Sequence, residues 1–193
     1  MIIKKFFKLI ISIALCLGAG FLGGLITTPK IATWYDSLTK PFFTPPAWVF
    51  GPVWTALYLL MGISLYLVWI QEEKNYKTKA AWQIFIIQLL LNIAWSAAFF
   101  GFESPIAGLV VIIILWVVII GTIYIFKQVS TWASYLLIPE LSFNLGYNKI
   151  NEIVFVKNKV IIWRRSRCIL KHLILFFIWE WLFLLIIICI LKV

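Results

Sequence analysis

The sequence predicts an all-α integral membrane protein, and three observations lead to this fold class. The chain has 193 residues, of which 64% are hydrophobic and only 12% are charged, whereas a soluble domain averages about 25% charged residues. Apolar runs of the ~20 residues that cross a bilayer recur along the chain. Pro-rich and polar stretches separate these runs. Because no length remains for a separate soluble domain, we expect the function to reside in the helices and their loops.

Four segments fit a membrane-spanning helix, at about 9–27, 47–70, 81–100 and 106–126. The first follows the basic "MIIKKFFK" and ends before Pro29. We interpret it as a retained span and not a signal peptide, because the run is long and "CLGAGFLGG" supplies small residues suited to helix contacts. Pro52 is tolerated in the first turn of the second span. Ser104 is expected to cap the fourth span, with Pro105 at its first position.

The remainder of the chain is harder to assign. A fifth element at 131–147 is only moderately apolar, and Pro139 and Glu140 interrupt it. A basic linker at 148–168 follows, and then a clear additional transmembrane helix at 169–191, with His172 near its start and Glu180 inside it. We therefore expect a bundle over residues 1–140, a weak fifth helix and an extra C-terminal hydrophobic helix.

Charge favours one topology. If four spans alternate, one side holds seven lysines and the other holds Lys30 and Lys40; the seven are Lys4, Lys5, Lys8, Lys74, Lys77, Lys79 and Lys127. The positive-inside rule then places the N-terminus inside. Keeping the later basic residues inside favours five crossings, although hydropathy alone allows six. The net charge of +10 is expected to meet anionic lipid and not nucleic acid.

The stretch 34–58, "WYDSLTKPFFTPPAWVFGPVWTALY", combines tryptophans with prolines between the first two spans. Pro41, Pro45 and Pro46 fix backbone angles and prevent a regular helix. The residues alone leave two interpretations open: an interfacial aromatic belt, or a rigid lid over a pocket.

One face of the third span is polar and aromatic. Its residues recur at i, i+3, i+4 and i+7 and so share a face; they are Asn92, Trp95, Ser96 and Phe99. An amide facing lipid would be costly, so the face should point inward. It could make a helix–helix hydrogen bond or line a pocket.

Three motifs give the chain a family resemblance. "WYDSLTKPFFTPPAWVFGPVWTALYLLMG", "QLLLNIAWSAAFFG" at 88–101 and "ASYLLIPE" at 133–140 resemble the TspO/MBR family of tryptophan-rich sensory and translocator proteins. The resemblance covers about residues 5–140. It implies a five-helix transmembrane bundle of TspO type, commonly a homodimer, with a pocket under the loop between helices one and two.

The family binds porphyrins, haem and related tetrapyrroles, and some members bind sterols or benzodiazepine-type drugs. The resemblance implies a sensory or regulatory role here, with light- and oxygen-dependent porphyrin degradation, porphyrin or lipid transport, or a non-functional remnant as alternatives. Carried over by motif, Pro41, Pro45 and Pro46 form the lid framework, and Trp54 is the candidate catalytic residue. The ligand-binding residues would be Trp34, Tyr35, Trp48, Trp54, Leu57, Tyr58, Asn92, Trp95, Ser96 and Phe99.

The chain departs from the family pattern after Pro139, where a tyrosine and the tryptophans of the fifth helix are missing. Binding is therefore favoured over catalysis, and a frameshift near codon 140 or a genuine extension both remain open.

No cofactor is required: His172 is the only histidine and lies outside the family-like region, so metal-free protoporphyrin should bind about as well as haem. Lys30 and Lys40 could pair with propionates, although solvated surface charges are the expected reading. "LGYNK" at 145–149 loosely fits a sterol-contact pattern. The spacing of Cys16, Cys168 and Cys189 suggests no metal site.

Overall fold

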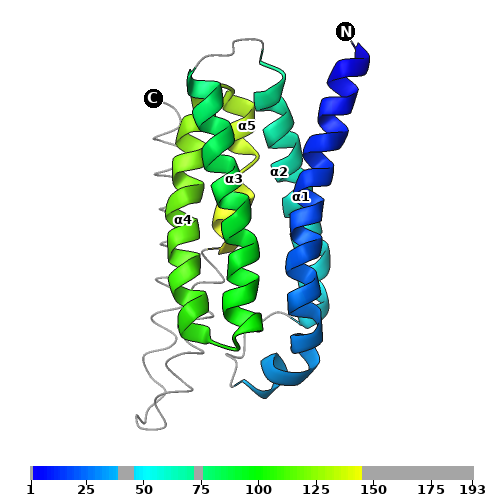
Figure 1. Cartoon of the computed structure of the whole chain (residues 1–193), viewed down its shortest axis with the longest axis vertical. Helices are drawn as coiled ribbons and strands as arrows, with labels where there is room; N and C mark the ends of the chain where they lie inside the picture. Colours follow the sequence, from blue (N-terminus) through cyan, green and yellow to red (C-terminus); the bar gives the residue numbers. More distant parts are fainter. Residues whose placement is uncertain (1, 39–45, 72–75, 145–193) are drawn as a thin grey trace. The chain divides into compact units, whose positions relative to one another are not determined.

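The computed structural model describes residues 2–38, 46–71 and 76–144, and within these ranges the backbone is almost entirely helical. Figure 1 shows the elements in chain order. The helices are α1 (Ile2–Lys30), α2 (Phe50–Trp69), α3 (Tyr76–Ser96), α4 (Pro105–Lys127) and α5 (Thr131–Tyr135). Single π-helical turns extend α1 over Ile31–Tyr35 and α3 over Ala97–Gly101, and a 3₁₀ turn at Ala47–Val49 precedes α2.

Four of the described helices are long and apolar enough to cross a membrane: Ile3–Tyr35, Phe50–Trp69, Lys77–Gly101 and Pro105–Lys127. They correspond to the four spans predicted from hydropathy. Ser104 caps α4 as expected, because its hydroxyl accepts a hydrogen bond from the Ala107 N–H at 3.3 Å, and Pro105 is the first helical residue. Pro52 lies in the first turn of α2, where its missing N–H leaves no bond unmade.

The first helix is longer than predicted, and the expectation that it ends before Pro29 was wrong. Its helical backbone continues through Pro29 to Lys30 and then through the π-helical turn to Tyr35. A proline removes one backbone donor, but in an apolar surrounding the remaining polar groups of the backbone still need internal partners. The Thr33 hydroxyl donates to the Pro29 carbonyl at 3.1 Å. Further helical turns therefore satisfy the backbone better than a loop does.

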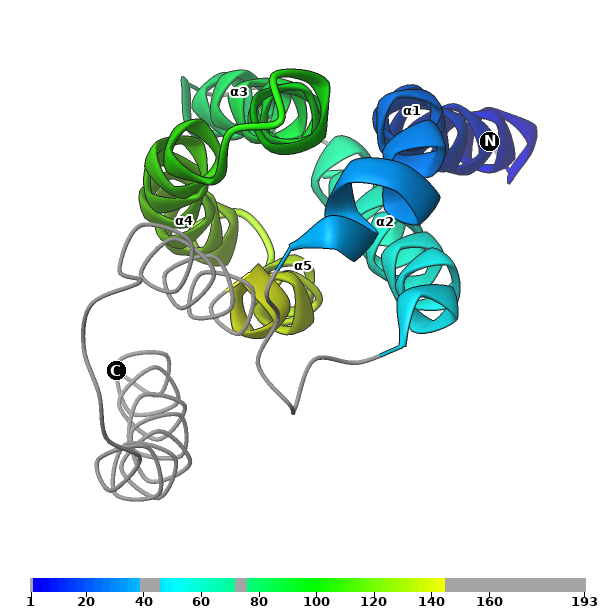
Figure 2. The same ribbon diagram turned by 90° about the horizontal axis from the view of Figure 1, so that it is seen from below.

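The five helices neighbour one another in the circular order α1, α2, α5, α4, α3, with α3 also contacting α1. Figure 2 shows this order along the helix axes.

Glycines allow some of these helices to approach each other closely. A Cβ on Gly62 of α2 would stand 2.8 Å from the Cα of Ile13, and one on Gly108 of α4 would stand 2.6 Å from the Phe99 ring.

The fifth predicted element forms in two helical pieces. α5 turns at residues 136–137, and the backbone is helical again over residues 138–144. Pro139 and Glu140 thus do not end it, because Pro139 lies in the first turn of the second piece, where proline is tolerated. Ser64 of α2 donates its hydroxyl to the Ala133 carbonyl at 2.7 Å, which holds α5 against α2. The predicted linker at 148–168 and helix at 169–191 lie outside the described residues.

Candidate functional site

A cavity of about 360 Å³ lies among α1, α2 and α3, at the lower end of the ~300–1,000 Å³ typical of small-molecule sites. Its wall on α1 combines three glycines with larger side chains: Gly20, Gly23 and Gly24 line the cavity together with Leu17, Phe21, Thr27 and Thr28. These glycines bring neighbouring side chains close: a Cβ at Gly20 would stand 2.5 Å from the Tyr58 ring, and one at Gly23 would stand 3.0 Å from the Ser96 hydroxyl. At Gly24 a Cβ would meet nothing within 4 Å. Gly20 and Gly23 therefore allow close packing against Tyr58 and Ser96, and Gly24 leaves space in the cavity.

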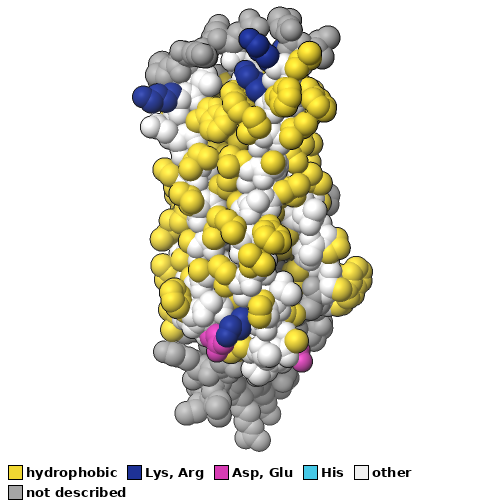
Figure 3. Space-filling model, turned by 45° about the vertical axis from the view of Figure 1, so that its right-hand side comes forward, with side chains coloured by type: hydrophobic (Ala, Val, Ile, Leu, Met, Phe, Trp, Pro, Cys, Tyr) yellow, Lys and Arg dark blue, Asp and Glu magenta, His cyan; other side chains and the backbone are white. Residues whose placement is uncertain are grey.

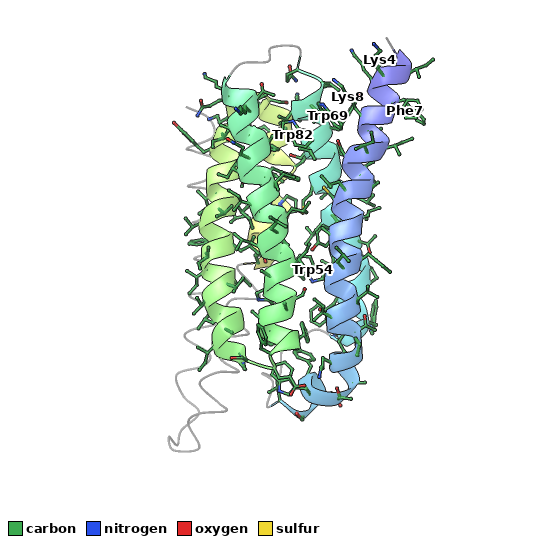
Figure 4. All side chains as sticks on the ribbon, viewed as in Figure 1. Lys4, Phe7, Lys8, Trp54, Trp69 and Trp82 are labelled. Carbon is green, nitrogen blue, oxygen red and sulfur yellow. The ribbon has the colours of Figure 1, made fainter. Side chains whose placement is uncertain are left out.

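Aromatic rings from α2 and α3 form the opposite wall. The indoles of Trp54 and Trp95 stack with centroids 6.2 Å apart and planes 29° apart. Trp54 also lies 5.8 Å from the Tyr58 ring, and Figure 4 shows its place between the helices. From the fifth element, Phe143 packs its ring against Trp54 at 5.3 Å and 85°. The wall thus presents flat faces whose orientation is fixed by neighbouring rings.

Hydroxyl groups supply the polar part of the lining, and no lining residue that the structure describes is charged. The hydroxyl-bearing lining residues are Thr27, Thr28, Tyr35, Thr55, Tyr58 and Ser96. Thr55 already donates to the Gly51 carbonyl at 2.8 Å. Such a lining suits an apolar, flat ligand that makes a few hydrogen bonds, because a charged group would lose its hydration there without a counter-charge.

The structure brings half of the predicted site residues to this cavity, namely Tyr35, Trp54, Tyr58, Trp95 and Ser96. Leu57 and Phe99 are buried in the core instead. Trp34 packs edge-on against Phe99 at 5.3 Å, so it supports the site without lining it. Trp48 is 74% exposed and is not among the lining residues.

The family resemblance implied that Trp34 and Tyr35 lie in the lid loop, and the structure places them in a helix instead. Both residues belong to the π-helical turn that continues α1, and Tyr35 is 4% exposed and packs against Phe50 and Phe100. Of the proposed lid framework, Pro46 is described, and its carbonyl accepts the Val49 N–H at 3.0 Å. Pro41 and Pro45 lie outside the described residues.

Asn92 points inward as predicted, and it makes a helix–helix hydrogen bond. Its side-chain N–H donates to Glu140 Oε1 at 3.0 Å, while the Gln88 amide donates to Glu140 Oε2 at 2.7 Å. All three side chains are at most 2% exposed. We call this set the carboxylate clamp. Of the two roles left open for Asn92, the structure shows the hydrogen bond between helices, and Asn92 is not a lining residue.

Sequence reasoning missed Glu140 and Gln88 in this clamp, as well as the glycines of α1. Glu140 carried a signal, since a lone carboxylate in an apolar segment is expensive and needs a partner. The glycines were predicted only to support helix contacts, because nothing local in the sequence distinguishes a glycine that packs from one that leaves a cavity.

The fold and the cavity define a helical membrane protein with an aromatic-lined cavity among its helices. Comparison with known proteins identifies the family: the sequence model of the TspO/MBR family matches residues 12–145, and the chain belongs to this family. The chain is 46% identical over 139 residues to the tryptophan-rich protein TspO of Chlorobaculum tepidum, covering 72% of this chain and 87% of that one. It is 43% identical over 152 residues to the TspO protein of Archaeoglobus fulgidus, covering 78% and 97%. It is 35% identical over 149 residues to the human translocator protein, covering 76% and 86%.

Proposed function

We propose that this membrane protein binds a tetrapyrrole of the porphyrin or haem type in the cavity among α1, α2 and α3, and acts as a sensor or regulator. The stacked pair Trp54 and Trp95 carries this proposal. A planar apolar macrocycle gains from flat aromatic walls fixed at offset-stacking distance, and Gly24 of α1 leaves space in the same cavity.

The charges around the cavity suggest how such a ligand would lie. Because no described lining residue is charged, we expect the apolar ring system to lie inside and the charged propionates to stay at the rim. Lys30 comes two residues after Thr28, a lining residue of α1. Its ammonium already pairs with Glu103 Oε1 at 2.7 Å. A propionate would have to compete with Glu103 for Lys30, so the carboxylates should add little to the affinity.

A titration with protoporphyrin IX in detergent, followed by tryptophan quenching and the porphyrin absorption band, tests the proposal. Trp95→Ala removes one wall of the cavity, and we expect it to weaken binding at least tenfold, since stacked aromatic contacts and buried ring area contribute about 1.5–3 kcal/mol. Trp48→Ala is the matched control, because Trp48 is 74% exposed and does not line the cavity. Equal affinity in the wild type and both variants would refute the proposed site.

Iron is expected to contribute little to binding. None of the residues that line the cavity in the described part of the chain is a histidine or cysteine, and the single histidine is His172. Protoporphyrin IX and haem should therefore bind with similar affinity. A clear preference for haem that disappears in His172→Ala would contradict this expectation.

A second function, light-driven oxidation of the bound porphyrin by dioxygen, is favoured by one observation. The fifth element contributes Phe143 to the site, while its described tryptophan, Trp132, is exposed and does not line the cavity. Trp95 stacks on Trp54, so a tryptophan pair is present beside the cavity. Aerobic illumination of the complex, with porphyrin absorbance as the readout, distinguishes turnover from binding alone. We expect any bleaching to be lost in Trp54→Phe while binding is retained.

We also propose that the N-terminus faces the inside and that the protein forms a homodimer, with sterol as a further candidate ligand. The lysine distribution supports the orientation. The dimer and the sterol rest on the family resemblance, and crosslinking in native membranes and competition by a sterol test them.

A further inference from the structure

One flank of α1 bears an exposed seam that begins with two lysines and continues with apolar residues. Its positions lie alternately four and three residues apart, so they share one side of the helix; they are Lys4, Lys8, Ile11, Leu15, Gly18 and Leu22. Ile11 is 51% exposed, Leu15 40% and Leu22 52%. Gly18 is a notch in the seam, because a Cβ built there meets nothing within 4 Å.

Two tryptophans lie beside the basic end of the seam. Lys8 Nζ donates to the Trp69 carbonyl at 3.1 Å and stands 5.7 Å from the centre of the Trp69 ring. Trp82 of α3 packs edge-on against Trp69 at 5.1 Å. Figure 4 shows Lys4, Phe7 and Lys8 at this end of α1, with Trp69 and Trp82 nearby. Tryptophan concentrates where membrane meets water, so these residues mark the level of the lipid headgroups.

The same end of the bundle is rich in cations. The ends of α1, α3 and α4 that meet there carry Lys4, Lys5, Lys8, Lys77, Lys79 and Lys127, and Figure 3 shows lysines at the upper end of the face drawn. At the opposite end, Lys30 is ion-paired with Glu103. The lysines of the described helices are therefore concentrated at the end of the bundle where the seam begins.

We propose that the seam binds one anionic phospholipid, with its phosphate held by Lys4 and Lys8 and one acyl chain lying along Ile11 and Leu15 to the notch at Gly18. The dimensions agree. Ten residues separate Lys8 from Gly18, which is about 15 Å of helix at ~1.5 Å per residue and half of the ~30 Å hydrocarbon thickness. An acyl chain of one leaflet thus ends near Gly18.

Charge argues against a second copy of the chain as the occupant. A two-fold symmetric pair joined along this seam would place Lys4 and Lys8 against the same residues of its partner, and like charges in close contact repel. A phospholipid with one net negative charge offsets part of the charge of the two ammonium groups, whereas a zwitterionic lipid also brings a cation to them.

Native mass spectrometry of the full-length protein in detergent tests the proposal, with dioleoylphosphatidylglycerol and dioleoylphosphatidylcholine as probes. Each lysine near a membrane surface contributes about 1 kcal/mol towards anionic lipid, so Lys4→Gln/Lys8→Gln should weaken the phosphatidylglycerol complex about 30-fold. Binding of phosphatidylcholine should hardly change. Lys5→Gln/Lys79→Gln removes the same charge from the same end but away from the seam, and should leave the wild-type preference intact.

Equal losses in the two double variants would overturn the proposal, since they would show a diffuse electrostatic effect without a site.

Gly18→Leu fills the notch and should weaken phosphatidylglycerol binding severalfold without changing charge. If it instead dissociates a dimer and leaves lipid binding unchanged, the seam belongs to a second copy and the proposal fails. Because Lys8 also holds the end of α2, Lys4→Gln alone, with an expected loss of about fivefold, tests the site without removing that contact.

Discussion

At the scale of single residues, the carboxylate clamp is the least expected feature of this chain. Glu140 Oε1 and Oε2 accept one hydrogen bond each from Asn92 and Gln88, at 3.0 and 2.7 Å. A buried carboxylate is tolerated in an apolar bundle only when hydrogen bonds replace its hydration. The clamp therefore joins α3 to the fifth element and keeps the polar face of α3 directed into the bundle.

Removing the carboxylate should cost more than neutralising it. Glu140→Ala removes the acceptor that the structure shows for the Gln88 amide and one of the two acceptors of the Asn92 amide, which keeps the Gln88 carbonyl at 3.2 Å. Each buried donor that loses its partner costs about 1–3 kcal/mol, so we expect a clearly lower midpoint of thermal unfolding in detergent. Glu140→Gln keeps an acceptor, and its amide can pair with a reoriented Gln88 or Asn92, so the loss should be smaller. Circular dichroism against temperature measures both. Equal destabilisation by the two substitutions would show that charge, and not hydrogen bonding, is what matters at this position.

At the scale of the elements, the glycines of the first two helices divide into those that pack and those that leave space. Gly62 lets the backbone of α1 approach, since a Cβ would stand 2.8 Å from the Cα of Ile13. Gly18 and Gly24 face open space. The same residue type thus sets helix spacing at one position and cavity or surface shape at another.

Alanine substitutions should separate these two roles. Gly62→Ala forces backbone against backbone, and overpacking of this kind costs about 1–3 kcal/mol, so the unfolding midpoint should fall. Gly18→Ala meets no neighbour and favours the helix by up to about 1 kcal/mol, so its midpoint should stay level or rise. A stable Gly62→Ala variant would mean that α1 and α2 can move apart freely.

The features that the sequence predicted correctly are those determined by residues close to one another in the chain. Rules for a single helix end predict the Ser104 cap, Pro105 at the first position and the tolerated Pro52. The helical spacing and the cost of an amide in lipid predict the inward face of Asn92, Trp95 and Ser96. What escaped prediction depends on distant partners. The clamp joins residues 48 and 52 positions apart, and the continuation of α1 past Pro29 depends on an apolar environment that no local rule describes.

At the scale of the whole molecule, the distribution of lysines is the basis for the orientation that we propose for the bundle. With the N-terminus inside, residues at the basic end of the bundle and residues after α1 should react from opposite sides. In a background with Cys16, Cys168 and Cys189 replaced by serine, Lys79→Cys should be labelled by a membrane-impermeant maleimide from the inside and Asp36→Cys from the outside. Labelling of both from the same side would contradict the crossing of α1.

The central claim is that the cavity among α1, α2 and α3 holds the tetrapyrrole, and two glycines of α1 test it most directly. Gly24 lines the cavity and Gly18 does not, while a Cβ at either position meets nothing within 4 Å. We would titrate Gly24→Leu and Gly18→Leu with protoporphyrin IX. We expect Gly24→Leu to lose at least tenfold in affinity, because the new side chain would occupy the proposed ligand space, and Gly18→Leu to bind like the wild type. Unchanged binding in Gly24→Leu, with the protein folded, would place the ligand elsewhere and contradict the account.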